Sequence, residues 1–311
     1  MDRGAILAVD VGGSKYVTGL VTEQGQILCK RKYRWKQMTS EGVTEEICSA
    51  MERILEENPG VEVKAVGMTI PGLADPERGI WLSASFMGIY ELPIGEIIRE
   101  RFGLPVYIDN DCNACALAEK RYGCCKDTDH FLYMTVSNSI GGALFINGQL
   151  YRGARGSAGE VGNIRVDEGL KGSGSRRDSL ENYASGRGLA ATYLKLGGLS
   201  EIDGEPPDGV AITRLADQGD QVALEAFRME GIYLGQAIAA CCALLDPEKV
   251  IIGGGLSLVF DRYQKPLLEA LERETVAVKG NRPQIRTTAL GYDGALLGAA
   301  ALAVCKIRGK S

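Results

Sequence analysis

Apolar and polar positions divide the chain into short apolar runs and longer segments with helical spacing, which is typical of an α/β protein. The first three runs are separated by turn residues, and they predict antiparallel strands over 5–11, 16–22 and 26–33. Helical spacing follows over 44–58. The pattern then predicts strands over 65–70 and 106–109 and helices over 93–102 and 111–122.

After residue 126 the same order of elements begins again. Strands are expected over 131–136, 141–146, 149–152, 250–252 and 284–289. Helices are expected over 180–196, 221–245, 266–274 and 294–305. The turn at 25–27 also has a counterpart at 148–150, where glycine again precedes glutamine and an aliphatic residue. We interpret this repetition as an internal duplication of one α/β unit, which predicts two lobes.

Length and charge narrow the class of protein. The chain has 311 residues, 45% of them hydrophobic, and a net charge of −5. That charge argues against nucleic acid or an anionic membrane as the main partner. The basic stretch 30–34 is interpreted as a solvated strand edge rather than a polyanion site. No secretory signal precedes the first strand, and the apolar run 232–245 is too short to cross a membrane, so a cytoplasmic protein is expected.

The nine cysteines are expected to be reduced thiols, because disulfides are rare in long intracellular chains. A metal or iron–sulfur site formed by Cys112, Cys115, Cys124 and Cys125 stays open as an alternative. The single histidine, His130, makes such a site harder to complete.

The first chemical motif joins an acidic residue to a glycine turn. Asp10 ends a predicted strand and is followed by Gly12, Gly13, Ser14 and Lys15. Backbone N–H groups in such a turn can bind phosphate, and Asp10 can hold Mg²⁺ through water. An ordinary Gly-Gly hairpin explains the motif equally well. Since both common nucleotide motifs are missing, any ATP site must have another architecture.

A second motif lies at a predicted strand-to-helix junction. Asp109, Asn110, Asp111 and Asn113 place two carboxylates and two carboxamides within five residues. Phosphoryl transfer to an alcohol needs a carboxylate that orients the hydroxyl and accepts its proton. Capping of the helix by Asp109 or Asn110 is the alternative, although one cap does not account for the whole cluster.

Two further segments have the composition of ligand loops. Glu160 and Asn163 lie on a glycine-flanked loop, and Glu181 follows a polar stretch, so these side chains suit sugar hydroxyls. The turn Gly253–Gly255 follows a predicted buried strand and offers a flat backbone surface to an adenine ring. A plain strand-to-helix turn is the alternative there.

Together these motifs resemble the ROK family (repressor, open reading frame, kinase) of bacterial sugar kinases and regulators. The resemblance runs from about residue 5 to residue 305. Its motifs are DxGGxK from Asp10, NDxNxxxxAE from Asn110, AGExG from Ala158, LExxASG from Leu180, DPxxxxxGGG from Asp246 and GALLGAA from Gly294.

The resemblance implies an actin-like, ribonuclease-H-like duplicated fold of the sugar kinase and hexokinase superfamily. It implies lobes over 1–112, joined by a C-terminal helix at about 291–311, and over 113–290. It also implies a cytoplasmic kinase with ATP and Mg²⁺ as cofactors. Sugar and ATP are then its partners, with neither nucleic acid nor membrane, and a homodimer stays open.

Roles for single residues follow from the same resemblance. Asp111 is expected to be the base for a sugar hydroxyl, usually the 6-hydroxyl. The expected sugar-binding set is Asn110, Asp111, Glu160, Asn163 and Glu181. The expected ATP and phosphate set is Asp10, Gly12, Gly13, Ser14, Lys15, Ser137, Asn138, Gly253, Gly254 and Gly255.

Two departures from the family pattern matter. Asn163 replaces the usual histidine, and 166–180 contains no cysteine, so the structural zinc site of many members is expected to be absent. Ser137-Asn138-Ser139 replaces a glycine-rich phosphate turn. Asparagine tolerates left-handed backbone, so a usable turn is still expected.

A hexose or aminosugar kinase is the leading hypothesis. A kinase for sugars substituted at the anomeric carbon, such as β-glucosides, is the first alternative. A non-catalytic sugar-binding regulator is the second. Regulators of the family carry a DNA-binding domain ahead of this region, and only nine residues precede Asp10, so the sequence favours an enzyme.

Overall fold

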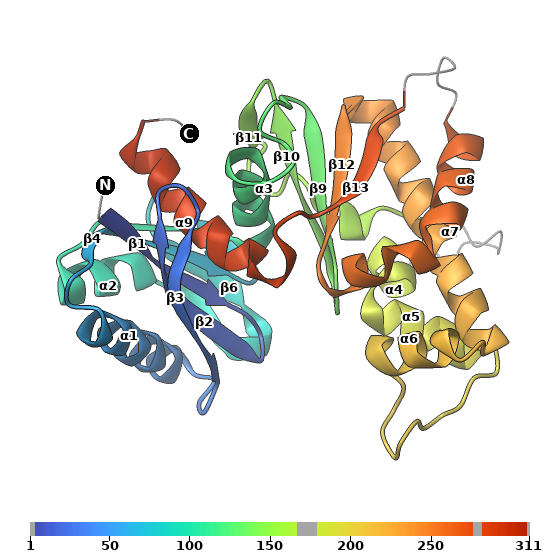
Figure 1. Ribbon diagram of the computed structural model, residues 1–311, viewed down its shortest axis with the longest axis horizontal. Coiled ribbons are helices and arrows are strands. Elements are labelled where there is room, and N and C mark those ends of the chain that lie inside the picture. The colour runs from blue at the N-terminus through green and yellow to red at the C-terminus, as the bar shows by residue number, and fades with distance from the viewer. Residues whose placement is uncertain (1–3, 167–178, 276–281, 310–311) are drawn as a thin grey trace. The chain divides into compact units, whose positions relative to one another are not determined.

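The computed structural model describes residues 4–166, 179–275 and 282–309. They form two compact units (Figure 1). Unit 1 comprises residues 1–127, 153–156 and 289–311, and unit 2 comprises residues 128–152 and 157–288. The C-terminal helix and residues 113–127 both pack within unit 1.

Unit 1 is built on a five-stranded sheet with the order β3-β2-β1-β4-β8. Its strands are β1 (Gly4–Val11), β2 (Lys15–Thr22), β3 (Ile27–Arg34), β4 (Glu62–Ile70) and β8 (Val106–Asn110). The first three strands form the predicted antiparallel meander, and β4 and β8 run parallel to β1.

Helices cover both faces of this sheet (Figure 1). Helices α1 (Ser40–Glu57) and α2 (Ile94–Phe102) contribute to one apolar cluster with the inward residues of β1. Helix α9 (Gly294–Ile307) lies on the other face, directly against β4, because a Cβ on Gly67 would lie 1.8 Å from the Ala299 carbonyl oxygen. Helix α3 (Asp111–Arg121) packs on α9, where Gly298 lies against Ala114.

Unit 2 repeats the same sheet. Its order is β11-β10-β9-β12-β13, with the same pattern of two antiparallel and two parallel pairings. The strands are β9 (Phe131–Val136), β10 (Ile140–Ile146), β11 (Gln149–Tyr151), β12 (Lys249–Gly253) and β13 (Gln284–Thr287). The duplication predicted from the sequence is therefore confirmed strand by strand.

Five helices accompany this second sheet. They are α4 (Leu180–Ala184), α5 (Gly186–Lys195), α6 (Gly209–Asp217), α7 (Gln221–Leu245) and α8 (Gln264–Glu274). Met134 and Ile252 of the sheet belong to one buried cluster with Phe227 and Leu234 of α7. Among the residues that the structure describes, no helix combines the length and apolarity needed to cross a membrane.

The sequence prediction missed two parts of the fold. A three-stranded sheet of β5 (Leu73–Asp75), β6 (Ile80–Ala84) and β7 (Ile89–Leu92) follows β4, and α6 occupies a stretch with no predicted element. The predicted helix 180–196 is divided into α4 and α5, since Ser185 is extended and caps the start of α5.

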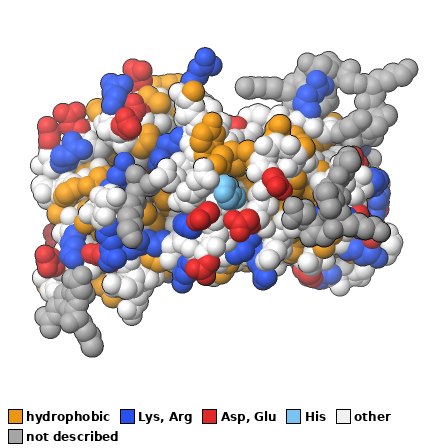
Figure 2. Space-filling model, turned by 90° about the horizontal axis from the view of Figure 1, so that it is seen from above, with side chains coloured by type: hydrophobic (Ala, Val, Ile, Leu, Met, Phe, Trp, Pro, Cys, Tyr) orange, Lys and Arg blue, Asp and Glu red, His pale blue; other side chains and the backbone are white. Residues whose placement is uncertain are grey.

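The basic stretch on β3 is partly neutralised, as expected for a solvated strand edge. Lys30 contacts Asp293 at 2.5 Å, and Arg31 contacts Glu57 at 2.8 Å. On the face seen in Figure 2, Lys and Arg side chains are interspersed with Asp and Glu side chains. All nine cysteines are free thiols in the structure.

Candidate functional site

Three parallel strands of unit 1 bring polar side chains to one edge of the sheet. Asp10 on β1 is opposite Thr69 on β4, and Thr69 is opposite Asp109 on β8. The Thr69 hydroxyl donates to Asp10 Oδ1 at 2.9 Å. Thr69 and Asp109 are buried, so this edge is held rigidly within the core of the unit.

The Asp10 carboxyl has a raised pKa. Burial, the largest cause, and the negative charge of Asp111 raise its pKa to about 6, against the lowering effects of the Thr69 hydrogen bond and of Lys15. A buried carboxyl whose pKa is raised by a second carboxyl marks a place where a cation is favourable. Oxygen ligands of this kind suit Mg²⁺, which keeps several waters and is bound through one or two carboxylates and phosphates.

Asp111 begins helix α3. Asn110 caps this helix through its side-chain oxygen, which accepts from the Asn113 amide at 2.8 Å. Asp111 Oδ1 accepts from the Cys112 amide at 2.8 Å, and Asp111 itself is half-buried. Burial raises the pKa of Asp111, and the hydrogen bonds from Cys112 oppose that effect. The result is an oriented carboxylate that binds a proton more readily than an ordinary Asp does.

The predicted phosphate turn follows Asp10. The Gly12 amide donates to the Lys15 carbonyl at 2.9 Å, and Trp35 Nε1 donates to the Gly12 carbonyl at 2.8 Å. Gly13 and the two residues after it are exposed. Neither Gly12 nor Gly13 has a positive φ. A Cβ on Gly13 would lie 3.0 Å from the exposed Phe86 ring, so a larger residue there would require that ring to shift.

In unit 2 the predicted sugar residues converge on β10. Glu181 Oε2 accepts from the Ile140 amide at 3.1 Å. The loop that carries Glu160 and Asn163 presses on the same strand, because a Cβ on Gly162 would lie 2.3 Å from the Ile140 carbonyl oxygen. Glu160 and Asn163 are exposed at either end of one short 3-10 turn, Val161–Asn163.

The predicted nucleotide turns of unit 2 also lie together. Ser137 and Asn138 follow β9, and Gly253–Gly255 follows the neighbouring parallel strand β12. Gly254 has φ of 81°, and a Cβ on it would lie 2.5 Å from the Val136 carbonyl oxygen. Asn138 does not have a positive φ; that conformation occurs at Asn147, in the turn between β10 and β11.

The structure thus brings together the predicted residues within each unit. Asp10, the turn 12–15, Asn110 and Asp111 lie at one strand edge of unit 1, and the predicted residues of unit 2 lie around β10 and at the ends of β9 and β12. Sequence reasoning missed Thr69 and gave no role to Arg187. Thr69 ends an apolar strand, so its hydroxyl gave only a weak signal.

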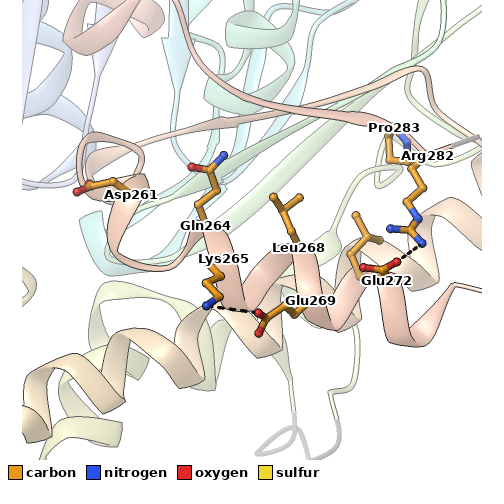
Figure 3. Close-up of a pocket in the computed structure, with 9 residues that line it drawn as sticks. Asp261, Gln264, Lys265, Leu268, Glu269, Glu272, Arg282 and Pro283 are labelled. Atoms are coloured by element: carbon orange, nitrogen blue, oxygen red, sulfur yellow. Dashed lines mark hydrogen bonds and ion pairs between the residues drawn. The ribbon is translucent and has the colours of Figure 1, made fainter. Parts of the chain in front are cut away.

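A hollow of about 490 Å³ on unit 2 lies away from these residues. It is lined by α8 and by Arg282 and Pro283 (Figure 3). Four of its labelled charges form two ion pairs, Lys265 with Glu269 and Arg282 with Glu272. None of the predicted site residues lines this hollow.

No group of three or more His, Cys, Asp or Glu side chains is arranged to hold a metal ion in the described part of the chain. Residues 167–178, where the resemblance places the zinc ligands of other family members, lie outside the described residues.

Comparison with known proteins decides the family. The model of the ROK family matches residues 6–306. The chain belongs to the ROK family. A glucokinase from Streptomyces coelicolor is 33% identical over 315 residues, which cover 96% of this chain and 98% of the relative. A xylose repressor from Caldicellulosiruptor bescii is 27% identical over 97% of this chain and 79% of its own length.

Solved structures of ROK proteins have the same fold. The crystal structure of a ROK-family glucokinase from Streptomyces griseus, in complex with glucose and AMPPNP, is 31% identical. It superposes with a TM-score of 0.81 over 96% of this chain and 99% of the other. The predicted family and the predicted actin-like duplicated fold are therefore confirmed.

Proposed function

We propose that this ROK protein is an ATP-dependent kinase that phosphorylates the 6-hydroxyl of a hexose or N-acetylhexosamine, with Asp111 as the base. One observation carries the proposal. Asp111 has one carboxylate oxygen fixed by the Cys112 amide, has a raised pKa, and lies near Asp10 at the end of β1. A base for an alcohol must be both oriented and able to take a proton.

The chemistry assigned to Asp111 is a single proton transfer. As the sugar oxygen forms its bond to the γ-phosphorus of ATP, the hydroxyl proton passes to the Asp111 carboxylate. The bond between the γ-phosphorus and the bridging oxygen breaks, and ADP leaves with that electron pair. Because the transition state is loose, positioning of the hydroxyl supplies much of the rate.

Asp10 would hold Mg²⁺ through water, and the metal would supply positive charge to the phosphates. Removal of the repulsion between Asp10 and Asp111 would then keep both carboxylates ionised. Lys15 adds positive charge at the start of β2 and already lowers the pKa of Asp10. The exposed backbone around Gly13 and Ser14 suits the phosphate chain.

Sugar recognition is assigned to Asn110, Asp111, Glu160, Asn163 and Glu181. The capping bond of Asn110 uses its side-chain oxygen and leaves the NH₂ group able to donate to a hydroxyl. Gly253–Gly255, with Ser137 and Asn138, is assigned to the nucleotide.

Full-length similarity to glucokinases supports the enzyme class, ATP-dependent sugar kinase. The similarity to a xylose repressor covers the same region of this chain, so a sugar-binding regulator is the alternative from another class. A kinase for β-glucosides is the alternative within the enzyme class.

An ATP-consumption screen tests the proposal. The intact protein is assayed with Mg²⁺ and ATP against free hexoses, N-acetylhexosamines and β-glucosides. The expected result is sugar-dependent ADP release with a free hexose or N-acetylhexosamine. Turnover with β-glucosides alone supports the first alternative. Sugar binding without ADP release from any sugar would contradict the proposal and support a regulator.

A further inference from the structure

The turn between β9 and β10 is tied to the start of helix α5. Arg187 Nε donates to the Asn138 carbonyl at 3.0 Å, and the Gly186 amide donates to the Ser137 carbonyl at 2.6 Å. The Ser137 amide in turn donates to the Ser139 carbonyl at 3.0 Å. Two successive carbonyls of the turn are therefore fixed by two successive residues of one helix.

Arg187 also faces a residue of the predicted sugar set. Its Nη2 lies 3.6 Å from Glu181 Oε1, while Glu181 Oε2 accepts from the Ile140 amide. Arg187 thus contacts the turn at Asn138, and Glu181 contacts it at Ile140. The two side chains therefore hold the turn on either side of Ser139.

The start of helix α5, which carries Arg187, is held in place by a buried cap. Ser185 caps α5 through its hydroxyl, which accepts from the Gly188 amide at 3.1 Å, and Ser185 is buried. The Arg187 side chain itself is 73% exposed. An exposed ion pair adds little to stability, so the hydrogen bond to the turn, which has a fixed direction, is the contact of consequence.

We propose that Arg187 is a positioning residue, which holds the Ser137-Asn138-Ser139 turn in the geometry that binds phosphate and links it to Glu181. The turn has no glycine at residues 137–139, and its central Asn138 does not have a positive φ. The guanidinium of Arg187, which lies outside the turn, fixes the Asn138 carbonyl of the turn. This inference rests on the proposed function, because it assumes that the turn binds the nucleotide.

Arg187→Ala and Arg187→Lys test the role, with Arg228→Ala as the matched control. Arg228 is also exposed and pairs with a glutamate, but it lies on α7 and does not contact the turn. Affinity for AMPPNP with Mg²⁺ is measured by calorimetry without sugar, and kcat/KM for ATP is measured with the sugar found in the screen. Thermal melting checks the fold of each variant.

Arg187→Ala is expected to weaken AMPPNP binding and to lower kcat/KM for ATP by about tenfold, with an unchanged melting temperature. Lysine should restore only part of the loss, because it lacks the planar donor set, and added guanidinium should recover activity in Arg187→Ala. Values within twofold of those of Arg228→Ala would overturn the proposal. A loss that guanidinium does not reverse and that accompanies a lower melting temperature would overturn it too.

The two proposals can fail separately. If no sugar is phosphorylated, the proposed function is wrong, while AMPPNP affinity still reports on Arg187. If sugars are phosphorylated and Arg187→Ala behaves like the control, only the role of Arg187 is wrong.

Discussion

Asp10 and Asp111 belong to different elements of unit 1, and the charge of Asp111 raises the pKa of Asp10. Burial is the largest cause of the raised pKa of each carboxyl. The pKa of Asp10, about 6, lies well above the usual value for an exposed Asp.

The dependence of kcat/KM on pH should reflect the protonation of Asp10 and Asp111. Activity should fall on the acid side with an apparent pKa near 6, because protonated Asp10 holds the metal poorly and protonated Asp111 cannot act as a base. In Asp10→Asn the acid limb near pH 6 should be lost, because the carboxyl whose pKa lies there has gone. A profile that stays flat from pH 8 to pH 5 would show that neither carboxylate limits the reaction.

Glu230 is a second unusual carboxyl, and the proposed reaction does not use it. It is buried on α7, and its oxygens accept no hydrogen bond from the described residues. Burial raises its pKa well above the usual value for Glu. Because the folded pKa exceeds the unfolded one, the stability that Glu230 contributes at low pH is lost as the pH rises above about 4.5.

Glu230→Gln should therefore stabilise the protein at pH 8 and have a smaller effect at pH 5. Glutamine keeps the shape of the side chain and removes the charge that a buried site disfavours. Urea unfolding at the two pH values measures the difference. Glu225→Gln is the control on the same helix, where Arg228 lowers the pKa of an exposed carboxylate, and it should show no such gain. Equal effects of Glu230→Gln at both pH values would contradict the assignment.

At the residue scale, the sequence pointed to candidate residues where neighbours along the chain gave the signal. Asp10, Asn110 and Asp111 were found because each stands at a strand end or helix start next to turn residues. Thr69 and Arg187 were not, because their partners are 59 and 49 residues away, and only the sheet register and the helix packing bring them together.

At the scale of elements, the two glutamates proposed to bind sugar have unequal surroundings. Glu160 is exposed on its turn, whereas Glu181 is bonded to the Ile140 amide and faces Arg187. Loss of Glu160 removes a ligand group, and loss of Glu181 also removes a support of the β9–β10 turn.

Glu160→Ala and Glu181→Ala should each weaken sugar affinity by about tenfold or more, which is about 1.4 kcal/mol. Only Glu181→Ala should also weaken AMPPNP binding. Calorimetry with each ligand measures both effects, and Glu269→Ala on α8 is an exposed control. Sugar affinity equal to that of the control in both variants would remove these residues from the site.

Elements with strong periodicity were predicted well, and those formed by long-range contacts were not. Helix α7 was predicted with its observed bounds, since an apolar stripe runs through it and Asp246-Pro247 ends it. The sheet of β5, β6 and β7 was missed because its strands are short and interrupted by turn residues. Trp81 is buried there and donates to the Pro71 carbonyl, a contact that no local pattern predicts.

At the scale of the whole molecule, the two units share the order and pairing of their strands, but they differ in the residues at the strand ends. In register, Asp10 of β1 corresponds to Thr135 of β9, and Thr69 of β4 corresponds to Gly253 of β12. At these positions unit 1 therefore has an aspartate where unit 2 has a threonine, and unit 2 has a glycine where unit 1 has a threonine. That difference agrees with the proposed roles of Asp10 at the metal and of Gly253–Gly255 at the nucleotide.

The purified protein should contain no stoichiometric zinc. A structural zinc site needs about four Cys or His ligands, and residues 163–181 include none. Elemental analysis after dialysis against a chelator should give far less than one zinc per chain. One retained zinc per chain would show that cysteines elsewhere, such as Cys124 and Cys125, hold a metal.

The most direct test of the account is the turnover of Asp111→Asn. The amide keeps the shape of the side chain but cannot accept the hydroxyl proton, so kcat should fall by about 10² to 10⁴. Sugar affinity, measured by calorimetry, should stay measurable, because the lost interaction belongs mainly to the transition state. Turnover at the wild-type rate in Asp111→Asn would contradict the central claim that this carboxylate is the base.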